Sequence, residues 1–283
     1  MQQTDTIKFS IVTPVYNSEA VINDLIKSVI EQGYQNWEMI IQDGQSSDNT
    51  LEILNYIDDE RIRVYSEKDK GMYDALNKAI DKAAGEYILH LNSDEQLMEN
   101  SLSEIVDCID KNPSHDVYCF GTIVIDKNYI PRVFRTAYPQ NPLLIKLFNF
   151  DIFTAGIVYK RKIFYELSFS SQYKAISDAI LFINILKGYN VFYSDVYTSL
   201  FFIGGDNLSL DLRAKNERES LVESVGIPKY LLPVLKVFKK LRKVYYKTFI
   251  YNGPKKITLY CNGSKQELAT DNIKFKLDWS VFK

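Results

Sequence analysis

The 283-residue chain has few of the residues that build disulfide frameworks and soft-metal clusters. It contains three cysteines, Cys108, Cys119 and Cys261, and two histidines, His90 and His115. The cysteine spacings fit neither a disulfide framework nor a zinc cluster, and they are typical of a protein kept in a reducing cytosol. We interpret both histidines as structural, one within an apolar strand and one in a turn.

Long apolar runs and a strong net charge are also missing. No apolar run reaches the roughly 18 residues that a membrane span needs. The first ten residues, MQQTDTIKFS, lack the basic and apolar segments of a secretory signal. The net charge of −2 gives the molecule as a whole no attraction to nucleic acid. We therefore expect a cytoplasmic protein, or one attached to the inner face of a membrane.

The first 112 residues alternate between apolar strands and amphipathic helices. The pattern predicts strands at 8–13, 37–42, 61–66 and 86–91, and helices at 18–32, 48–57 and 72–85. Ser18 is the expected N-cap of the first helix. This alternation predicts a doubly wound, mostly parallel sheet of the α/β class. In such sheets ligands bind beyond the carboxyl ends of the strands.

The remainder of the chain is less regular. It predicts helices at 99–111 and 178–188, and strands at 116–126, 132–138, 154–161 and 191–203. The tail after residue 257 alternates like strands, at 257–261 and 273–279, around Asn262 and Gly263, which predicts a hairpin. We divide the chain into a first half at 1–112, a second half at 113–225, and an extension at 226–283.

The extension begins with a basic amphipathic helix. Residues 229–256 contain nine Lys and Arg and no Asp or Glu. An apolar stripe that includes Leu235, Phe238 and Leu241 predicts contact with a membrane, and the alternative is packing on the catalytic domain. The residues predicted to bind an anionic membrane are Lys236, Lys239, Lys240, Arg242, Lys243 and Lys247.

Four polar clusters follow the four predicted strands: 14–17, 42–50, 66–71 and 92–95. Tyr16 presents a ring that could stack on a base, unless it caps the core. Asp43 can accept hydrogen bonds from a ribose or a base, whereas Asp48 is explained by helix capping. The charged loop at 66–71 precedes a helix whose amino end, together with Lys78, could donate hydrogen bonds to a diphosphate. The alternative is that this loop is solvated surface. One carboxylate, Asp94, suffices for a cation that phosphates and water also coordinate.

These stretches read DGQSSDNT, SEKDKGMYDALNKA and LNSDE. In this order they resemble glycosyltransferase family 2, inverting enzymes of the GT-A fold. They are most similar to bacterial enzymes of O-antigen, capsule and exopolysaccharide assembly, whose pattern is DGxSxDGT, SExDxGxYDAxNKG and LNSDD. The resemblance covers residues 8–112 well and extends more weakly to about residue 209. It implies that residues 1–112 are the nucleotide-sugar-binding half of the domain and residues 113–225 the acceptor-binding half.

The resemblance implies the site residues one by one. The nucleotide-sugar site is expected to use Pro14, Tyr16, Asp43, Asp69, Tyr73, Asp74, Asn77, Lys78, Asn92 and Ser93. The family's metal-binding DxD falls on residues 92–94, so Asp94 is the expected ligand of Mn²⁺ or Mg²⁺. Asn92 stands where the family has its first Asp, and Glu95 replaces a usual second one.

The resemblance also implies a catalytic base, which is an Asp at the start of a helix. The segment KAISDAILFINIL places Asp178 there, and a plain helix cap is the alternative. The family often has a His-containing phrase near 153–156, which this chain lacks. The segment GGDNLS (204–209) resembles a loop that closes near the donor phosphates.

The implied activity is transfer of a sugar from a nucleotide diphosphate sugar, UDP-linked in the first instance, to a lipid-linked saccharide acceptor. Two alternatives remain. The first is a non-catalytic binding protein that keeps the nucleotide pocket without turnover. The departures from the family motif at Asn92 and Glu95 favour this alternative, whereas the presence of Asp94 and Asp178 favours the enzyme. A sugar nucleotidyltransferase would share the sheet, but it usually has a Gly-rich, basic loop after the first strand, and PVYNSEA is not such a loop.

Overall fold

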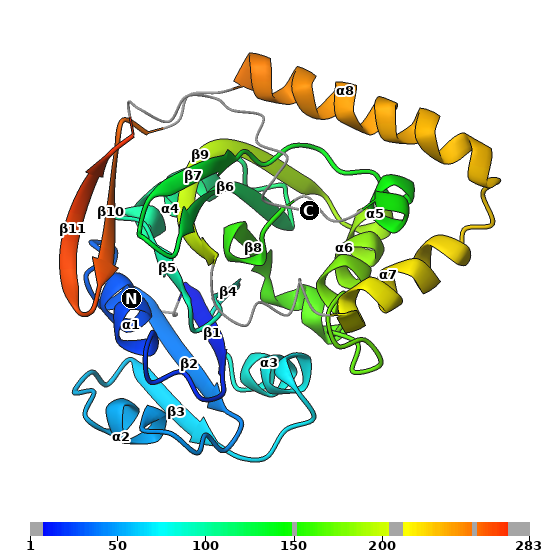
Figure 1. Cartoon of the computed structure of the whole chain (residues 1–283). Coiled ribbons are helices and arrows are strands. Elements are labelled where there is room, and N and C mark those ends of the chain that lie inside the picture. The colour runs from blue at the N-terminus through cyan, green and yellow to red at the C-terminus, as the bar shows by residue number, and fades with distance from the viewer. Residues whose placement is uncertain (1–7, 149–151, 204–211, 251–253, 271–283) are drawn as a thin grey trace.

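The computed structural model describes residues 8–148, 152–203, 212–250 and 254–270. Nine strands form one curled sheet with helices on both faces, and two further strands form a hairpin beside it (Figure 1). The strand order is β3–β2–β1–β4–β8–β6–β9–β5, and β7 pairs with β6. The sheet therefore joins both halves of the chain.

The first half of the chain contributes four parallel strands, as predicted. These strands are β1 (Phe9–Val15), β2 (Trp37–Asp43), β3 (Ile62–Ser66) and β4 (Tyr87–His90). The helices between them are α1 (Ile22–Ile30), α2 (Thr50–Asn55) and α3 (Met72–Asp81). All four strands point their carboxyl ends to one edge, so the loops that follow them meet there.

The second half extends the same sheet. Its strands are β5 (Glu95–Leu97), β6 (Val117–Asp126), β7 (Pro131–Arg135), β8 (Ile157–Lys160) and β9 (Val191–Ile203). Its helices are α4 (Ser101–Lys111), α5 (Pro142–Phe148), α6 (Ser177–Gly188) and α7 (Leu212–Glu223). β8 runs antiparallel between β4 and β6, whereas β6 and β9 are parallel. The predicted doubly wound, mostly parallel sheet is confirmed.

The buried strands alternate between the two faces of the sheet. Ile11, Met39 and Leu89 belong to a core cluster with α1 and α4, and their neighbours Val12 and Ile40 belong to a second cluster with α3 and α6. Side chains alternate across a strand, so near-continuous apolar runs indicate burial on both faces. Because helices cover both faces, the polar loops lie at the edge where the parallel strands end.

Several local predictions were wrong. α1 begins at Ile22 with no side-chain cap, and the Ser18 hydroxyl hydrogen-bonds to Ser93 instead. The strand predicted at 154–161 starts with a 3₁₀ turn, Thr154–Gly156. A second 3₁₀ turn (Arg161–Tyr165) was not predicted, nor were β5, α5 and α7.

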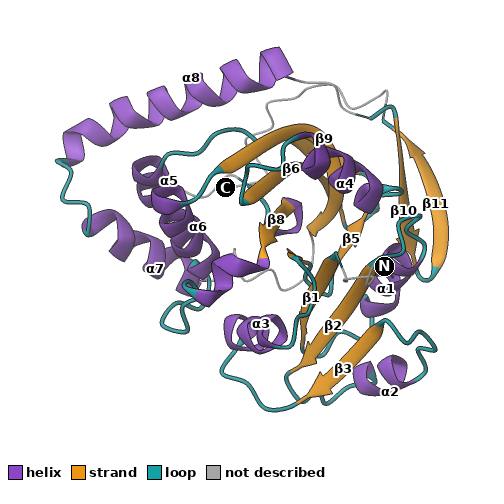
Figure 2. Cartoon of the chain, turned by 180° about the vertical axis from the view of Figure 1, so that it is seen from behind, coloured by secondary structure: helices purple, strands orange, loops and turns teal. Residues whose placement is uncertain are grey.

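The C-terminal extension contains a long helix and the predicted hairpin. α8 (Leu232–Ile250), preceded by a 3₁₀ turn (Lys229–Leu231), runs along the outer edge of the molecule in both views (Figures 1 and 2). The hairpin pairs β10 (Lys256–Cys261) with β11 (Ser264–Ala269), so the turn at 262–263 is confirmed. The other segment read as a strand, 273–279, lies outside the described residues.

The hairpin packs against α1 of the first half. Asp24 accepts hydrogen bonds from the backbone N–H groups of Asn262, at 3.0 Å, and Gly263, at 2.6 Å. The Tyr260 hydroxyl donates to Glu31, the C-cap residue of α1. The extension is thus fastened to the domain through this hairpin.

Candidate active site

Two neighbouring loops, after β1 and β2, are joined by hydrogen bonds. The Ser47 N–H donates to Asn17 Oδ1 at 2.8 Å, and the Ser18 N–H donates to Thr50 Oγ1 at 2.7 Å. Pro14 is buried in β1, whereas Tyr16 beyond it is 63% exposed. The alternative in which Tyr16 caps the core is therefore wrong, and its ring is open to a ligand.

Asp43 lies at the end of β2 and is fully buried. Its carboxylate accepts hydrogen bonds from the backbone N–H groups of Gln45 and Ser46 and from the hydroxyls of Ser46, at 2.5 Å, and Ser66, at 2.6 Å. These donors hold the loops after β2 and β3 together. The predicted contact with a base or ribose therefore requires one of the two serine hydroxyls to turn away from Asp43.

Asp69 packs directly against the β2 loop. A Cβ atom at Gly44 would lie 2.4 Å from Asp69 Oδ2, so a larger residue at position 44 would require the Asp69 side chain to move. The same Cβ would lie 3.5 Å from the Tyr16 ring. The other oxygen, Asp69 Oδ1, accepts the Gly71 N–H at 2.7 Å. Asp69 thus lies beside Gly44, which also adjoins the Tyr16 ring, and its predicted role in the nucleotide-sugar site remains a prediction.

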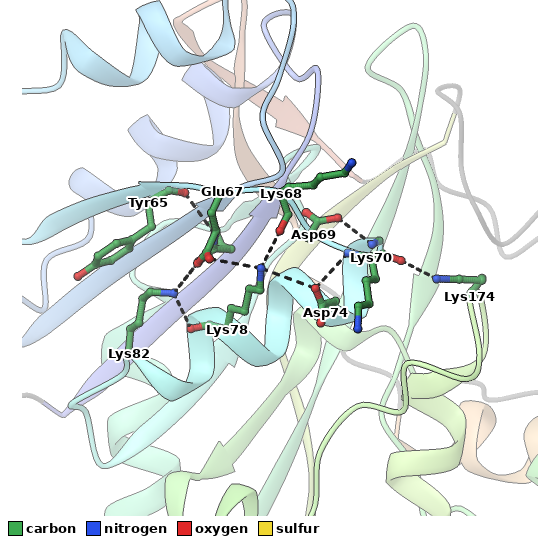
Figure 3. Close-up of polar contacts among 11 residues, drawn as sticks. Tyr65, Glu67, Lys68, Asp69, Lys70, Asp74, Lys78, Lys82 and Lys174 are labelled. Atoms are coloured by element: carbon green, nitrogen blue, oxygen red, sulfur yellow. Dashed lines mark hydrogen bonds and ion pairs between the residues drawn. The ribbon is translucent and has the colours of Figure 1, made fainter.

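The first turns of α3 organise the charged loop that precedes the helix (Figure 3). Asp74 accepts the Lys70 N–H at 3.0 Å. The Lys78 ammonium donates to the Lys68 carbonyl at 2.8 Å and lies 3.4 Å from the Glu67 carboxylate. In the structure these two predicted donor-site residues, Asp74 and Lys78, hold the loop in place, and their predicted ligand contacts remain a prediction.

Asn77 has a different contact from the predicted one. Its Nδ2 donates to the Phe169 carbonyl at 2.8 Å, and its Oδ1 accepts the Phe169 N–H at 3.0 Å. Both ends of the amide are therefore occupied by the backbone of a fully buried residue. The geometry makes Asn77 a support for the chain at position 169, and its predicted contact with the donor sugar remains a prediction.

Replacing Asn77 by Ala should lower the melting temperature. The change leaves the N–H and C=O of Phe169 without partners, and each unsatisfied buried group costs about 1–3 kcal/mol. We expect a loss of roughly 2–5 kcal/mol, measured by thermal or urea unfolding. Asn216→Ala on α7, an exposed helical asparagine, is the control and should be neutral. Equal stability of the two variants would contradict this role.

The loop after β4 holds the predicted DxD position. Asn92 Oδ1 lies 3.0 Å from His90 Nε2, and Ser93 accepts the Ser18 hydroxyl at 2.9 Å. His90 is buried, and burial lowers the pKa of its imidazole to about 4, so the ring is neutral at neutral pH. His90 therefore orients Asn92, and Ser93 links this loop to the β1 loop.

The two carboxylates that follow, Asp94 and Glu95, differ in burial and in hydrogen bonding. Glu95 is buried in β5 and accepts the Asn92 N–H at 2.7 Å; burial and the charge of Asp94 raise the pKa of Glu95 to about 8. Asp94 is half-buried, and burial raises its pKa. Within the described residues, the Asp94 carboxylate has no partner beyond its own N–H. A group of three or more carboxylate, Cys or His ligands is not found in that part of the chain.

Asp178 lies in the first turn of α6, at its second residue, so it is not the N-cap. The Tyr73 hydroxyl donates to Asp178 Oδ1 at 3.2 Å, although the two residues are 105 positions apart. Burial raises the pKa of Asp178, and hydrogen bonds from the Ala179 N–H and from Tyr73 oppose this shift. The candidate base is thus brought to the donor-site helix α3.

Residues that the sequence did not single out fix the turn before Asp178. Glu217 on α7 accepts the N–H groups of Lys174, at 2.7 Å, and Ala175, at 3.0 Å. The Lys174 ammonium donates to the Lys70 carbonyl at 2.5 Å (Figure 3). A small pocket between the two loops is lined by Lys70, Gly71, Met72, Tyr73, Asp74, Ser171, Tyr173 and Lys174. The predicted loop GGDNLS lies outside the described residues.

The predicted membrane-binding residues lie on α8. Lys236 and Lys240 are exposed, whereas Lys239 is half-buried with its ammonium 5.9 Å from the centre of the Phe148 ring. Arg242, Lys243 and Lys247 belong to the described helix, but their side chains lie outside the description. Within the described ranges, no helix combines the length and the apolarity needed to cross a membrane.

The geometry defines an α/β protein whose predicted site residues gather at the carboxyl ends of parallel strands. The sequence profile described as "Glycosyl transferase family 2" matches residues 10–168, more than half of the chain. The chain belongs to glycosyltransferase family 2, and the resemblance inferred from its motifs is confirmed.

Individual relatives agree with this assignment. The chain is 33% identical over 190 residues to UDP-Glc:alpha-D-GlcNAc-diphosphoundecaprenol beta-1,3-glucosyltransferase WfgD of Escherichia coli, which covers 66% of this chain and 73% of WfgD. It is 41% identical over 98 residues to the putative teichuronic acid biosynthesis glycosyltransferase TuaG of Bacillus subtilis. That second match covers 34% of this chain and 39% of TuaG.

The fold matches a solved structure over a longer stretch. The crystal structure of S. aureus TarS 1–349 in complex with UDP-GlcNAc superimposes with a TM-score of 0.59 at 23% identity. The match covers 72% of this chain and 61% of the TarS chain. At this identity the likeness establishes the shared fold.

Proposed function

We propose that the protein transfers a sugar from a UDP-sugar to a saccharide carried on a lipid diphosphate, with inversion, in surface polysaccharide assembly. The observation that supports this most directly is the 3.2 Å hydrogen bond between Tyr73 and Asp178. It brings the one candidate base to the helix that follows the donor-site loop. The name of WfgD includes both a UDP-sugar and a diphosphoundecaprenol-linked acceptor, which supports the same substrate classes.

The reaction follows from these positions. The acceptor hydroxyl oxygen attacks the anomeric carbon on the face opposite UDP, and Asp178 takes its proton. The bond between the anomeric carbon and the β-phosphate oxygen breaks, and UDP leaves with that electron pair. The ring of Tyr16 would stack on the uracil, and the loop that Asp69 and Asp74 organise would face the diphosphate. Attack from the opposite face inverts the anomeric configuration.

Asp94 fits a divalent cation. Its carboxylate lies in the loop between β4 and β5 without another side chain bound to it, whereas Glu95 beside it is buried and accepts the Asn92 N–H. A hard cation prefers oxygen ligands and leaves several positions for phosphate and water. When bound, Mn²⁺ or Mg²⁺ would neutralise charge on the leaving diphosphate. We propose Asp94 as the protein ligand and Asn92 as a neighbour that contacts the ribose.

A transfer assay tests the proposal. Labelled UDP-glucose and UDP-N-acetylglucosamine are incubated with the protein, Mn²⁺ and a lipid diphosphate-linked saccharide, and UDP release and labelled lipid are measured together. The proposal expects both products in equal amounts for one donor. UDP-sugar binding without release in any combination would favour the non-catalytic alternative.

We propose further that α8 attaches the enzyme to the inner face of an anionic membrane, where a lipid-linked acceptor resides. Four apolar side chains on one face of α8 are more than half exposed, namely Val234, Val237, Phe238 and Leu241. Their spacing of three and four residues aligns them along the helix. Exposed apolar patches of this kind mark membrane or protein contacts. The contact of α8 with the body uses another side, through Lys239.

Vesicle binding should depend on salt and on the basic residues of α8. Each Lys or Arg near an anionic surface contributes about 1 kcal/mol, which salt reduces. Changing Lys239, Lys240, Arg242 and Lys243 to Gln should therefore weaken sedimentation with anionic vesicles by about 10-fold or more at low salt. The control changes the exposed Lys111, Lys127, Lys187 and Lys215 and should bind normally. Equal binding to neutral and anionic vesicles, or none to either, would contradict the proposal.

A further inference from the structure

The helix that follows the donor-site loop also contacts the candidate base. Tyr73 on α3 is 5% exposed, and its hydroxyl donates to Asp178 Oδ1 at 3.2 Å. Its ring stacks on Phe169, with centroids 5.6 Å apart and planes 11° apart. The ring is therefore held by packing while its hydroxyl reaches the carboxylate.

The same helix holds the stacking partner in place. Asn77 lies four residues after Tyr73, on the same face of α3, and binds both backbone groups of Phe169. A second link runs from Lys174, just before α6, to the carbonyl of Lys70, just before α3. Four residue pairs thus connect α3 and its loop to the segment 169–178, which contains the candidate base: Tyr73 with Asp178, Tyr73 with Phe169, Asn77 with Phe169, and Lys70 with Lys174.

We infer that Tyr73 is a positioning residue for the reaction: its hydroxyl holds the Asp178 carboxylate ionised and oriented, and links it to the donor-binding helix. This inference rests on the proposed role of Asp178 as the base. It replaces the predicted direct contact of Tyr73 with the nucleotide sugar. A hydrogen bond donated to a carboxylate favours its charged form, which is the form that accepts the acceptor's proton.

The charged and titratable groups around Asp178 come from three elements. Tyr73 on α3 donates to it, Tyr159 on β8 lies within electrostatic range, and Arg218 on α7 lowers its pKa. Tyr159 is fully buried, and burial raises its pKa well above the usual value, so it stays neutral. Of these groups, Tyr73→Phe removes one hydroxyl and changes no formal charge.

The test measures kcat/KM against pH for Tyr73→Phe. Loss of the hydrogen bond from the Tyr73 hydroxyl raises the pKa of Asp178. The acidic limb of the profile should therefore move to higher pH by about one unit. Below that limb kcat/KM should fall about 10-fold, while the affinity for UDP is unchanged. Tyr118→Phe is the matched control, because it also removes one buried tyrosine hydroxyl, which here binds the Asn112 carbonyl at 2.7 Å.

The controls distinguish a structural role of Tyr73, a variant that does not fold, and a wrong assignment of the base. A purely structural Tyr73 would lower the melting temperature without moving the limb, and that result overturns the inference. If Tyr73→Phe does not fold, Phe169→Leu removes the stacked ring and should shift the limb in the same direction; an unmoved limb overturns the inference. Asp178→Asn is measured alongside. If it is fully active, the proposed base is wrong; if it is inactive and Tyr73→Phe leaves the limb unmoved, only the inference fails.

Discussion

Replacing Asp178 by Asn should lower kcat by about 10²–10⁴-fold, the usual cost of losing a general base. The amide cannot take the acceptor's proton, but its oxygen can still accept the Tyr73 hydroxyl, so the fold should be retained. Affinity for UDP should be unchanged because Asp178 acts on the acceptor. Rapid-quench transfer assays and calorimetric titration with UDP measure these two effects separately.

The pH profile of the wild type gives a second readout. Burial raises the folded-state pKa of Asp178 above that of an ordinary Asp. The base works only when ionised, so activity is lost as the pH falls through that raised pKa. This acidic limb should disappear from the residual activity of Asp178→Asn. Asp195→Asn, an exposed Asp on β9, is the control and should keep the wild-type profile. A full rate in Asp178→Asn would assign the base elsewhere.

The fold of the first half could be predicted because local pattern and tertiary structure agree there. Strands β1, β2 and β4 are apolar on both faces, and α1 and α3 each have one apolar face. Buried parallel strands with covering helices require these patterns. The positions of the four polar loops then follow from topology alone, because parallel strands end at a common edge.

The elements that escaped prediction lack such a local signal. β5 has only three residues and is defined by its pairing with β9. α7 has a largely polar sequence, LRAKNERESLVE, and no apolar face that would predict it. Its packing against α5 and the contacts of Glu217 with the turn before α6 are tertiary features. Sequence periodicity does not report such contacts.

The candidate site likewise contains residues whose positions could be predicted and residues whose contacts could not. Tyr16, Asp69 and Asp94 lie at the rim, where their motifs predicted them. The individual contacts of Tyr73 and Asn77 were not predictable, because their partners lie about 100 residues away in sequence. A motif thus predicts which residues gather at a site, whereas the division between ligand contact and support depends on the packed structure.

Replacing Asp94 by Ala should abolish the Mn²⁺-dependent part of donor binding. Asp94 is the one proposed protein ligand, and removing even an outer partner of a metal ligand typically costs 10–100-fold in affinity. We expect at least about 100-fold weaker UDP binding in the presence of Mn²⁺, and no change in its absence. Titration calorimetry with UDP, with Mn²⁺ and with EDTA, measures both values.

The fold should tolerate this change. The Asp94 carboxylate binds no other side chain in the described part of the chain, and burial disfavours its charge. Removing it also relieves the repulsion that helps raise the pKa of the neighbouring Glu95. The melting temperature without metal should therefore be unchanged or higher. Asp58→Ala, at an exposed position, is the control for loss of one negative charge. Full activity of Asp94→Ala in Mn²⁺ would show that this position is not the metal ligand, because no other carboxylate has been assigned to the cation.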